Sequence, residues 1–194
     1  MSLETKVYSV LVVSAAENFN AALSDMLPEQ KYDPVYTVSS VSAAKRMFSE
    51  SSFDFVIVNS PLPDDVGTRF AIDCSSSSDT AVLVMVRSEF YPEIYEKVVG
   101  HGVFILQKPT SKPTIATALD WLASARERLR KFEKKTLSIE EKMAEIRLVN
   151  KAKWLLIGEL HMDEPDAHRY IEKQAMDRCI SRREIAEEII KTYS

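Results

Sequence analysis

Glycine, cysteine and long apolar runs are scarce in this chain. Its 194 residues include only four glycines and two cysteines, and nowhere does it carry the roughly 18 consecutive apolar residues that a membrane-spanning helix needs. The N-terminus also lacks the basic and apolar regions of a signal peptide. Cys74 and Cys179 have no CxxC partner or histidine cluster, which favours reduced thiols over a disulfide framework or a zinc site. We therefore expect a cytoplasmic protein without a membrane partner or a metal site.

Residues needed for catalysis are also missing. The sequence contains no Gly-rich loop of the kind that cradles phosphates, and no nucleophile can be paired with a base. No enzyme activity, catalytic residue or cofactor is therefore expected. With 45 % apolar and 28 % charged residues the chain has ordinary globular composition, and its length fits one medium domain and one small domain.

Charge is distributed unevenly along the chain. Residues 1–120 hold nine Lys and Arg against 15 Asp and Glu, whereas residues 121–194 hold 16 against 14. A nucleic-acid partner is consequently expected on the C-terminal part. The excess there is small, so the local clustering of basic residues has to carry that expectation.

Short apolar runs alternate with helical patterns over residues 6–122. Five runs are expected as strands: Val7–Val13, Pro34–Val38, Phe53–Val58, Ala81–Val86 and Val103–Leu106. Apolar residues at helical spacing follow each run: Asn18–Leu27, Ser42–Ser49, Thr68–Cys74, Pro92–Val99 and Pro113–Ala125. Five such units predict an α/β fold, a doubly wound parallel sheet with helices on both faces. The functional crevice of such a sheet lies at the carboxyl ends of its strands.

Three segments of this region share a recognisable order and spacing. They are VLVVSAAENF from residue 10, FDFVIVNSPLPDDVG from residue 53 and VFILQKPTSKP from residue 103. Together they resemble the receiver domains of response regulators. In that family two acidic residues after the first strand bind Mg²⁺, and an Asp that ends the third strand accepts a phosphoryl group. The corresponding positions here are Ser14, Ala15 and Asn59.

These departures predict a receiver that is not phosphorylated. A carboxamide is a poor nucleophile where a carboxylate forms an acyl phosphate, and Ser14 with Ala15 offers no carboxylate to Mg²⁺. Arg87 replaces the expected Thr or Ser, and only the Lys-Pro step at Lys108 keeps the pattern. For Lys108 a structural bond to Asn59 or to a loop carbonyl is favoured over binding of a small anion. Control by a partner protein, by a ligand at the altered pocket or by abundance stays open.

From Leu122 onward the pattern becomes a heptad repeat. With Leu122 at position a, most a and d positions over four heptads are apolar and the residues between them are strongly charged, which is typical of a coiled coil. The repeat predicts a homodimer held by Leu122, Leu129, Phe132, Ile139, Met143 and Ile146. Ser138 with Glu141 fits a capping box, so a break near Leu137 stays open. The basic run Arg126–Lys135 is interpreted as a solvated helix face in preference to a phosphate-binding segment.

The C-terminal residues predict three short helices around one apolar centre. The first runs through Lys142–Leu160, and Asp163 is the expected N-cap of the second. Ser181 with Glu184 forms a capping box for the third helix. Three such helices can bury one another's apolar faces and form a miniature bundle.

Five motifs keep their order and spacing in this bundle. They are Ala152-Lys153, Glu164-x-x-Ala167, Gln174-Ala175-Met176-Asp177, Ser181-Arg182, and Ile185-Ala186 with the closing Ile189. They resemble the transcription-antitermination domain called ANTAR, from which Trp154 departs because many members carry Gly there. The resemblance implies binding to nascent leader mRNA, in which family members recognise the apical loops of paired small hairpins. Binding of this kind prevents an overlapping terminator stem from forming.

Basic and aromatic side chains of the bundle are the expected RNA contacts. Loop bases can stack on aromatic rings and be read on their exposed edges, whereas A-form duplexes hide theirs. The expected contacts are Lys151, Lys153, Arg169, Tyr170, Lys173, Arg178, Ser181, Arg182 and Arg183. Arg182 and Arg183 begin a predicted helix, whose free N–H groups also favour a phosphate. For Tyr170 a core role and a stacking role both stay open.

Other residues of the bundle are interpreted as structural. Ala152, Ala167 and Ala175 are expected to pack closely between helices, and Met176 is expected to fill the core. Trp154 is expected to be exposed or to face a dimer partner.

The sequence thus predicts a receiver-like domain at residues 1–121, a coiled-coil linker at 122–141 and an ANTAR domain at 142–194. The function expected from this arrangement is RNA-binding transcription antitermination. The alternative is a DNA-binding response-regulator-like transcription factor controlled by a partner or a ligand, which would need a recognition helix for the major groove. The acidic residues of Glu184–Glu188 argue against the last helix in that role.

Overall fold

The computed structural model describes residues 6–77 and 79–193 of the chain. The chain divides into two units, Met1–Arg130 and Lys131–Ser194, each with its own buried apolar residues. One helix, α5 (Lys112–Leu160), contributes residues to both units. Within the described residues no helix combines the length and the apolar character that crossing a membrane requires.

A five-stranded parallel sheet forms the first unit, in the order β2-β1-β3-β4-β5. The strands are β1 (Tyr8–Val13), β2 (Tyr32–Val38), β3 (Phe55–Asn59), β4 (Ala81–Arg87) and β5 (Phe104–Lys108). Each strand expected from the sequence is present, and the doubly wound α/β fold is confirmed. The strand order reverses between β1 and β3, the switch point at which sheets of this kind bind ligands.

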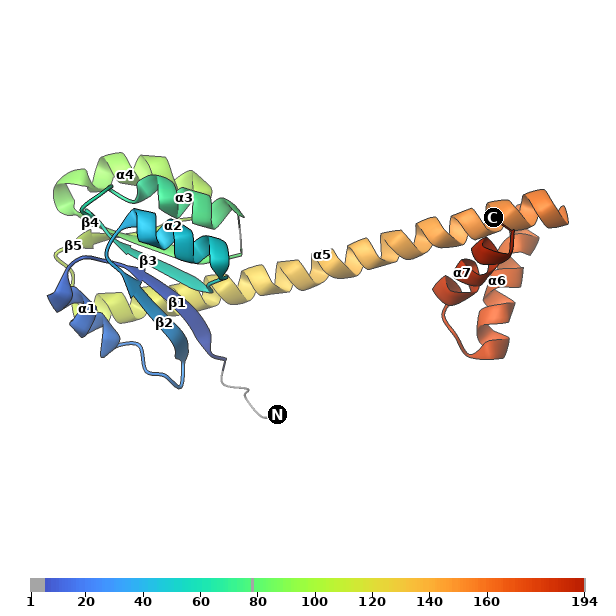
Figure 1. The fold of residues 1–194 in the computed structure, drawn as a ribbon, viewed down its shortest axis with the longest axis horizontal. Helices are drawn as coiled ribbons and strands as arrows, with labels where there is room; N and C mark the ends of the chain where they lie inside the picture. The colour runs from blue at the N-terminus through green and yellow to red at the C-terminus, as the bar shows by residue number, and fades with distance from the viewer. Residues whose placement is uncertain (1–5, 78, 194) are drawn as a thin grey trace. The chain divides into compact units, whose positions relative to one another are not determined.

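Helices cover both faces of this sheet (Figure 1). They are α1 (Glu17–Ser24), α2 (Val41–Glu50), α3 (Thr68–Ser77), α4 (Tyr91–Val98) and the first part of α5, with short 3-10 turns at Ser88–Phe90 and Val99–His101. Leu11 and Val13 of β1 belong to the core beneath α2, α3 and α4, whereas Val10 and Val12 belong to the core beneath α1 and α5. This alternation follows from the two-residue period of a strand. Because both faces are covered, the central strands are apolar at nearly every position.

The first unit continues along α5 past residue 121, the boundary expected from the sequence. Leu122 is fully buried in the core that α5 shares with α1. Beyond it, the carboxylate of Asp54, just before β3, accepts hydrogen bonds from Arg126 Nε at 2.7 Å and Arg130 Nη2 at 2.8 Å. The interpretation of the whole basic run as a solvated face is therefore wrong, because these two arginines bind the sheet's own unit.

Replacing Asp54 with alanine is expected to destabilise the first unit by about 2 kcal/mol, because it removes the acceptor that two partly buried guanidinium groups share. Burial raises the pKa of Asp54, but hydrogen bonds from Arg126 and Ser9 and the charges of both arginines outweigh burial and hold it below its usual value. A carboxylate with a lowered pKa stabilises the fold above its unfolded pKa of about 4, and the effect is lost as pH falls through the folded pKa.

Urea unfolding of the full chain at pH 7 and pH 3 measures this effect. The difference between wild type and Asp54→Ala should shrink at pH 3, because this pH lies below the unfolded pKa of about 4 and proton uptake by the unfolded chain then offsets the stabilisation. Asp120→Ala is the matched control, since Asp120 is 72 % exposed and its pair with Lys31 should contribute less than about 0.5 kcal/mol. Equal losses for the two variants at pH 7 would contradict the role of Asp54.

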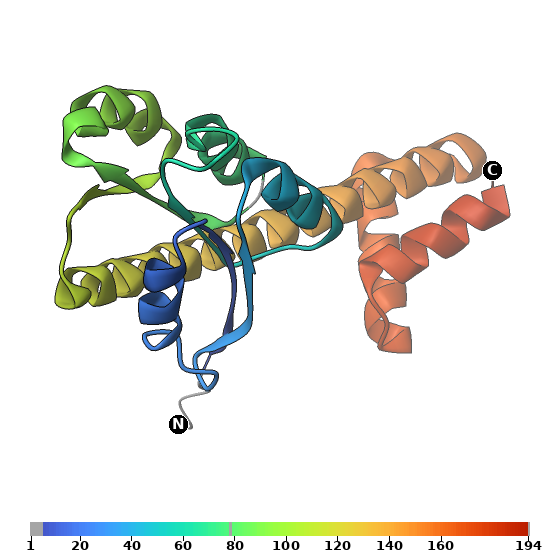
Figure 2. The ribbon, with the colours of Figure 1, turned by 60° about the vertical axis from the view of Figure 1, so that its left-hand side comes forward.

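The second unit is a bundle of the C-terminal part of α5 with α6 (Glu164–Arg178) and α7 (Arg182–Tyr193) (Figure 2). Its buried residues are Ala152, Leu156, Ala167, Ile171, Ala175, Ile185, Ala186 and Ile189. The three alanines interpreted as close-packing residues all lie in this core, and that interpretation is confirmed. Small side chains there let the helix backbones approach one another closely.

Local side-chain bonds define the ends of α6 and α7. Asp163 Oδ1 accepts from the amide of Asp166 at 2.7 Å, which is the expected N-cap. The amide of Ser181 donates to Glu184 Oε2 at 2.8 Å while Glu184 N donates to Ser181 Oγ at 3.2 Å, so the capping box is confirmed. The alternative box at Ser138 does not form, because α5 runs through that position without a break.

Candidate functional site

Internal hydrogen bonds close the pocket at the carboxyl ends of β1, β3 and β5. Asn59 Nδ2 donates to Ser14 Oγ at 3.0 Å, and Lys108 Nζ donates to Asn59 Oδ1 at 2.6 Å and to the carbonyl of Ser60 at 2.5 Å. Ser14 and Asn59 are both buried. The structural role expected for Lys108 is confirmed, since its ammonium group contacts both Asn59 and a loop carbonyl.

The other residues expected in this pocket add no acidic group. Ala15 is exposed and offers only a methyl group, and the exposed Arg87 side chain lies 3.7 Å from Glu89. Burial lowers the pKa of Lys108, and the positive charge of Arg87 lowers it further. Mg²⁺ takes carboxylate oxygens in sites of this type, so the side chains at these positions do not fit the ion.

The acidic residues of the loop after β3 bind the protein backbone. Asp64 accepts from the amides of Val41 and Ser42 at 2.9 Å each, at the start of α2. These backbone bonds hold the pKa of Asp64 below its usual value. Asp65 accepts from the amide of Gly67 at 2.6 Å. Both carboxylates therefore shape the loop, as the turn-like sequence indicates.

The outward face of α6 carries a basic and apolar group of side chains. Ala167, Ile171 and Ala175 form its buried face, and Arg169, Lys173 and Met176 recur at helical spacing on the opposite side. Met176 is 78 % exposed, so the prediction that it fills the core is wrong. Tyr170 lies at the edge of this face and is 38 % exposed, and Trp154 on α5 is 72 % exposed, as expected.

Most of the cations expected to contact RNA form ion pairs within the bundle. The pairs are Lys153–Glu164 at 2.6 Å, Arg169–Asp166 at 2.8 Å, Arg178–Glu188 at 2.5 Å and Arg183–Glu187 at 3.0 Å. Ion pairs at the surface stabilise a fold only weakly, so a phosphate can replace the carboxylate at little cost. Lys153 differs, because only 16 % of its side chain is exposed. Lys151 and Lys173 are exposed, with no ion pair identified in the described part of the chain.

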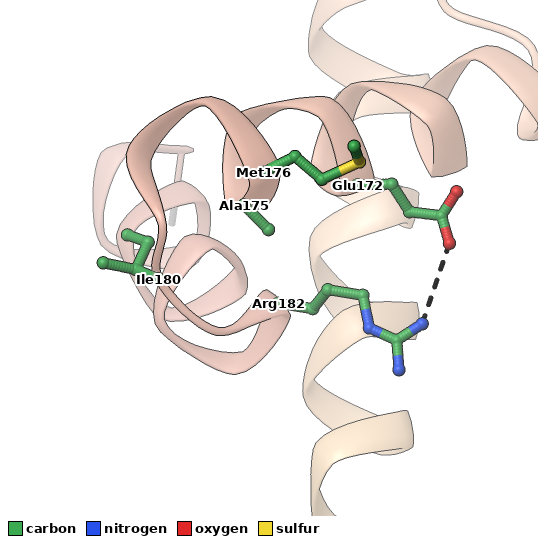
Figure 3. Close-up of a pocket in the computed structure, with 5 residues that line it drawn as sticks. All are labelled: Glu172, Ala175, Met176, Ile180 and Arg182. Carbon is green, nitrogen blue, oxygen red and sulfur yellow. Dashed lines mark ion pairs between the residues drawn. The ribbon is translucent and has the colours of Figure 1, made fainter.

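Arg182 lies at the edge of a hollow of about 360 Å³ beside the start of α7 (Figure 3). The hollow is lined by Glu172, Ala175, Met176, Ile180 and Arg182. The guanidinium of Arg182 lies 3.7 Å from Glu172 and 3.4 Å from Glu145. Since Arg182 is the first residue of α7, free backbone N–H groups lie close by. The hollow thus combines an apolar floor with an edge at which Arg182 is paired with Glu172 and Glu145.

The expected RNA contacts do not form one continuous patch. Arg169 and Lys173 lie on the outward face of α6 and Arg182 at the hollow, while Ser181 caps α7. Arg178 instead binds Glu188 in a second hollow, which is also lined by Ile180, Glu184, Glu187 and Lys191. The outward face of α6 with the start of α7 is therefore better suited to a polyanion than the rest of α7.

The residues expected at a dimer interface differ in exposure. Phe132, Ile139, Met143 and Ile146 are 47 to 58 % exposed, and Leu129 is partly buried. Leu122 contradicts the expectation, because it is buried in the first unit and cannot reach a second chain. The heptad repeat assigned Leu122 to the dimer interface because a leucine that faces the core of its own unit has the same spacing along the helix as one that faces a partner helix.

Family models match both parts of the chain. The ANTAR domain model matches residues 138–190, and the model for glucose-6-phosphate isomerase matches residues 12–120. The transcriptional regulatory protein PdtaR of Mycobacterium tuberculosis is 26 % identical over 184 residues, which cover 94 % of this chain and 89 % of that protein. The same match is found for two strains of that organism.

Solved structures resemble the first unit. A structure of adenylate cyclase from Rhodopirellula baltica matches with a TM-score of 0.60 at 19 % identity, over 66 % of this chain and 96 % of that chain. The signal receiver domain of an HD domain-containing protein from Pseudomonas fluorescens Pf-5 matches with a TM-score of 0.58 at 16 % identity, over 68 % of this chain and 96 % of that chain. These likenesses show the fold of the unit.

The isomerase match and the receiver match cover the same strands. We assign this part to the receiver fold, on its strand order and its solved relatives. The ANTAR model matches the C-terminal part of the chain, and the regulatory protein PdtaR is similar over nearly the whole length of both proteins. The chain belongs to the ANTAR-domain response regulators, with a receiver-fold domain ahead of the ANTAR domain.

Proposed function

We propose that this regulator acts in transcription antitermination by binding hairpin loops in nascent leader mRNA, which prevents a terminator stem from forming. The observation that carries the proposal is the ANTAR match over residues 138–190, because it includes every expected RNA contact. We further propose that the regulator works as a homodimer joined through α5 and that its receiver domain is not phosphorylated.

The outward face of α6 and the start of α7 support RNA as the ligand. Arg169, Lys173 and Arg182 supply positive charge, and Tyr170 with Met176 supplies exposed apolar surface beside it. Unpaired loop bases need both kinds of contact, since their phosphates are charged and their faces are apolar. A major-groove helix is less well supported, because α7 exposes Glu184, Glu187 and Glu188.

The closed pocket supports a receiver controlled by something other than phosphorylation. The nucleophile position holds Asn59, whose carbonyl oxygen is occupied by Lys108 and whose amide is bonded to Ser14. A partner protein or a ligand at the altered pocket is the proposed source of control. The division into a receiver domain, a linker and an ANTAR domain is part of the same proposal, with the packing of the receiver domain extended along α5 to Arg130.

Binding to a two-hairpin leader RNA, compared with duplex DNA of equal length, tests the proposed ligand. Arg182→Ala/Arg183→Ala is expected to weaken RNA binding about tenfold or more, since two phosphate contacts are lost. The slope of the logarithm of the binding constant against the logarithm of the salt concentration should become shallower by about 0.7 for each lost contact. Lys45→Ala/Lys97→Ala is the matched control, because it removes two exposed cations of the first unit. Gel shifts at several salt concentrations measure both quantities.

Two results would contradict the proposal in different ways. Tighter binding to duplex DNA than to the hairpin RNA would support the DNA-binding alternative and reject antitermination by RNA binding. RNA binding that is equally strong in Arg182→Ala/Arg183→Ala and in the control would keep RNA as the ligand but reject this placement of the interface.

A further inference from the structure

The hollow beside the start of α7 has an acidic and a basic side chain at its edge that are not hydrogen-bonded to each other (Figure 3). Arg182 Nη1 lies 3.7 Å from Glu172 Oε1, which is longer than a hydrogen bond. Glu145 lies 3.4 Å from Arg182 Nη2, and His168 Nε2 lies 3.3 Å from Glu172. Within the described residues neither of these contacts has the geometry of a hydrogen bond. Glu172 and Arg182 therefore keep their hydrogen-bonding groups available to a ligand.

Other arginines of the bundle use their N–H groups on their own partners. Arg178 donates to Glu188 at 2.5 and 2.7 Å, and Arg183 donates to Glu187 at 3.0 Å. Arg182, by comparison, is attracted to its partners by charge alone. A ligand that supplies an acceptor to Arg182 gains a hydrogen bond without breaking one within the protein.

The floor of the hollow is apolar. It is formed by Ala175, Met176 and Ile180. Met176 is 78 % exposed, and a thioether makes favourable contacts with aromatic rings. Apolar surface with a few polar groups along one side is typical of sites for flat aromatic ligands, whose faces are apolar and whose edges form hydrogen bonds. Among the parts of an RNA loop, an unpaired base has this character.

We propose that this hollow binds an unpaired guanine base of the RNA loop. The Glu172 carboxylate accepts hydrogen bonds from N1–H and N2–H of the base, and the Arg182 guanidinium donates to O6. The inference rests on the proposed RNA-binding function and adds the base that the site recognises. On guanine the two N–H groups and O6 are neighbours along one edge, just as Glu172 and Arg182 are neighbours at the edge of the hollow.

Guanine fits this pair of side chains better than the other bases do. Adenine and cytosine carry a ring nitrogen with a lone pair beside their amino group, so that a carboxylate there would gain one hydrogen bond and face a lone pair. Uracil has a single N–H between two carbonyl oxygens, one of which would face the carboxylate. Groups left unpaired in this way disfavour the wrong base, and this is a common source of specificity.

Cations beside the hollow can hold the phosphates that flank the base. Arg169 and Lys173 lie on the outward face of α6, next to the row that carries Glu172 and Met176. The Arg182 fork has five N–H donors, so that it can contact O6 and a phosphate at once. A carboxylate in an RNA site otherwise repels phosphate groups, and recognition of guanine accounts for the presence of Glu172 among these cations.

Selection from a pool of two-hairpin RNAs with fixed stems and randomised loops tests the base, with the full chain as bait. Wild type is expected to enrich guanine at one loop position about fivefold or more over each other base. Glu172→Gln is expected to lose this enrichment, because the amide of Gln presents a donor where guanine needs an acceptor. Total RNA binding by this variant should stay the same or rise, since a negative charge is removed.

Two further variants separate base recognition from charge. Glu187→Gln is the matched control, because it removes the same charge from α7 outside the hollow and should leave the guanine enrichment unchanged. Arg182→Lys keeps the positive charge but loses the planar fork. It is expected to reduce the guanine enrichment severalfold while the salt dependence of binding stays that of wild type.

The outcomes separate this inference from the proposed function. A pool that binds wild type without guanine enrichment, or with an enrichment that survives Glu172→Gln, would overturn the guanine site and leave RNA binding intact. Equal loss of enrichment in Glu187→Gln would also overturn it, since charge alone would then set the preference. A folded wild-type chain that binds no RNA of the pool would reject the proposed function and the guanine site with it.

Discussion

Incubation with acetyl phosphate and Mg²⁺ is expected to leave the wild-type receiver domain unmodified. The same treatment is expected to phosphorylate a variant that carries Ser14→Asp, Ala15→Asp and Asn59→Asp. The wild-type pocket has no carboxylate at these positions to attack the phosphoryl donor or to hold the metal ion. The triple variant supplies the nucleophile and two metal ligands at once, on strands whose order is already that of a receiver.

The single variant Asn59→Asp is expected to gain less than about a tenth of the modification of the triple variant, because a bound metal ion neutralises charge that builds up during phosphoryl transfer. Lys108 already donates to the side chain at position 59 at 2.6 Å, so it would pair with the new carboxylate. That pairing stabilises the buried charge but does not replace the metal. The nucleophile and its metal ligands therefore have to be restored together.

Intact-protein mass spectrometry followed by peptide mapping measures these outcomes. Adding EDTA to the triple variant is the control, and it should abolish the modification. A phosphoryl group mapped to the wild-type pocket would contradict the proposal that this receiver is not phosphorylated. A folded triple variant that stays unmodified would show instead that Arg87, at the position where receivers carry Thr or Ser, also blocks the reaction.

The parts of this fold that the sequence predicted well are those with local causes. The strands depend on runs of apolar residues, and the capping box depends on Ser181 and Glu184, which lie three residues apart. A hydrogen bond between neighbours in the sequence has few alternatives to compete with it. The local pattern predicted a doubly wound parallel sheet, but it did not predict the order of the strands, which the structure gives as β2-β1-β3-β4-β5.

Contacts between distant residues escaped prediction from the sequence. Nothing near Asp54 indicates that it binds Arg126 and Arg130, which come more than 70 residues later. The heptad assigned Leu122 to a dimer interface because core-facing and partner-facing leucines have the same spacing. Which interface buries a leucine depends on the elements that pack beside it.

The RNA-binding surface was only partly predictable for a related reason. The sequence identifies the basic residues, but it does not show that Arg178 pairs with Glu188 while Lys173 lies on the outward face of α6. Met176 illustrates the limit, since its type suggests a core residue and its helical phase places it outside. Charge and residue type can be read from a sequence, whereas the side of α6 that is exposed to a ligand depends on how the three helices pack.

Ala167→Leu is expected to unfold the second unit or destabilise it by about 3 kcal/mol, and to abolish RNA binding with it. Ala152, Ala167 and Ala186 are fully buried in the small core, and extra methyl groups in a well-packed core cost about 1 to 3 kcal/mol. A unit of this size has a total stability of only about 3 to 9 kcal/mol. One larger side chain at this position therefore removes a large share of that stability.

Hydrogen exchange measured by mass spectrometry resolves this loss, because peptides from α6 and α7 report on the second unit alone. Ala144→Leu is the matched control, since Ala144 is an exposed residue of α5 and the same substitution there should change stability by less than about 0.5 kcal/mol. Peptides from β1 and β3 should keep their protection in both variants, because the sheet has its own core.

Leader RNA binding by the same variants distinguishes a packing role for Ala167 from a contact role. If Ala167 packs between helices, Ala167→Leu loses protection and RNA binding together, whereas the nearly isosteric Ala167→Ser retains both. A folded Ala167→Leu variant with full protection in α6 and no RNA binding would contradict this assignment. It would mean that α6 meets RNA through the face that carries Ala167, and Arg169 and Lys173 on the opposite side would then not belong to the interface.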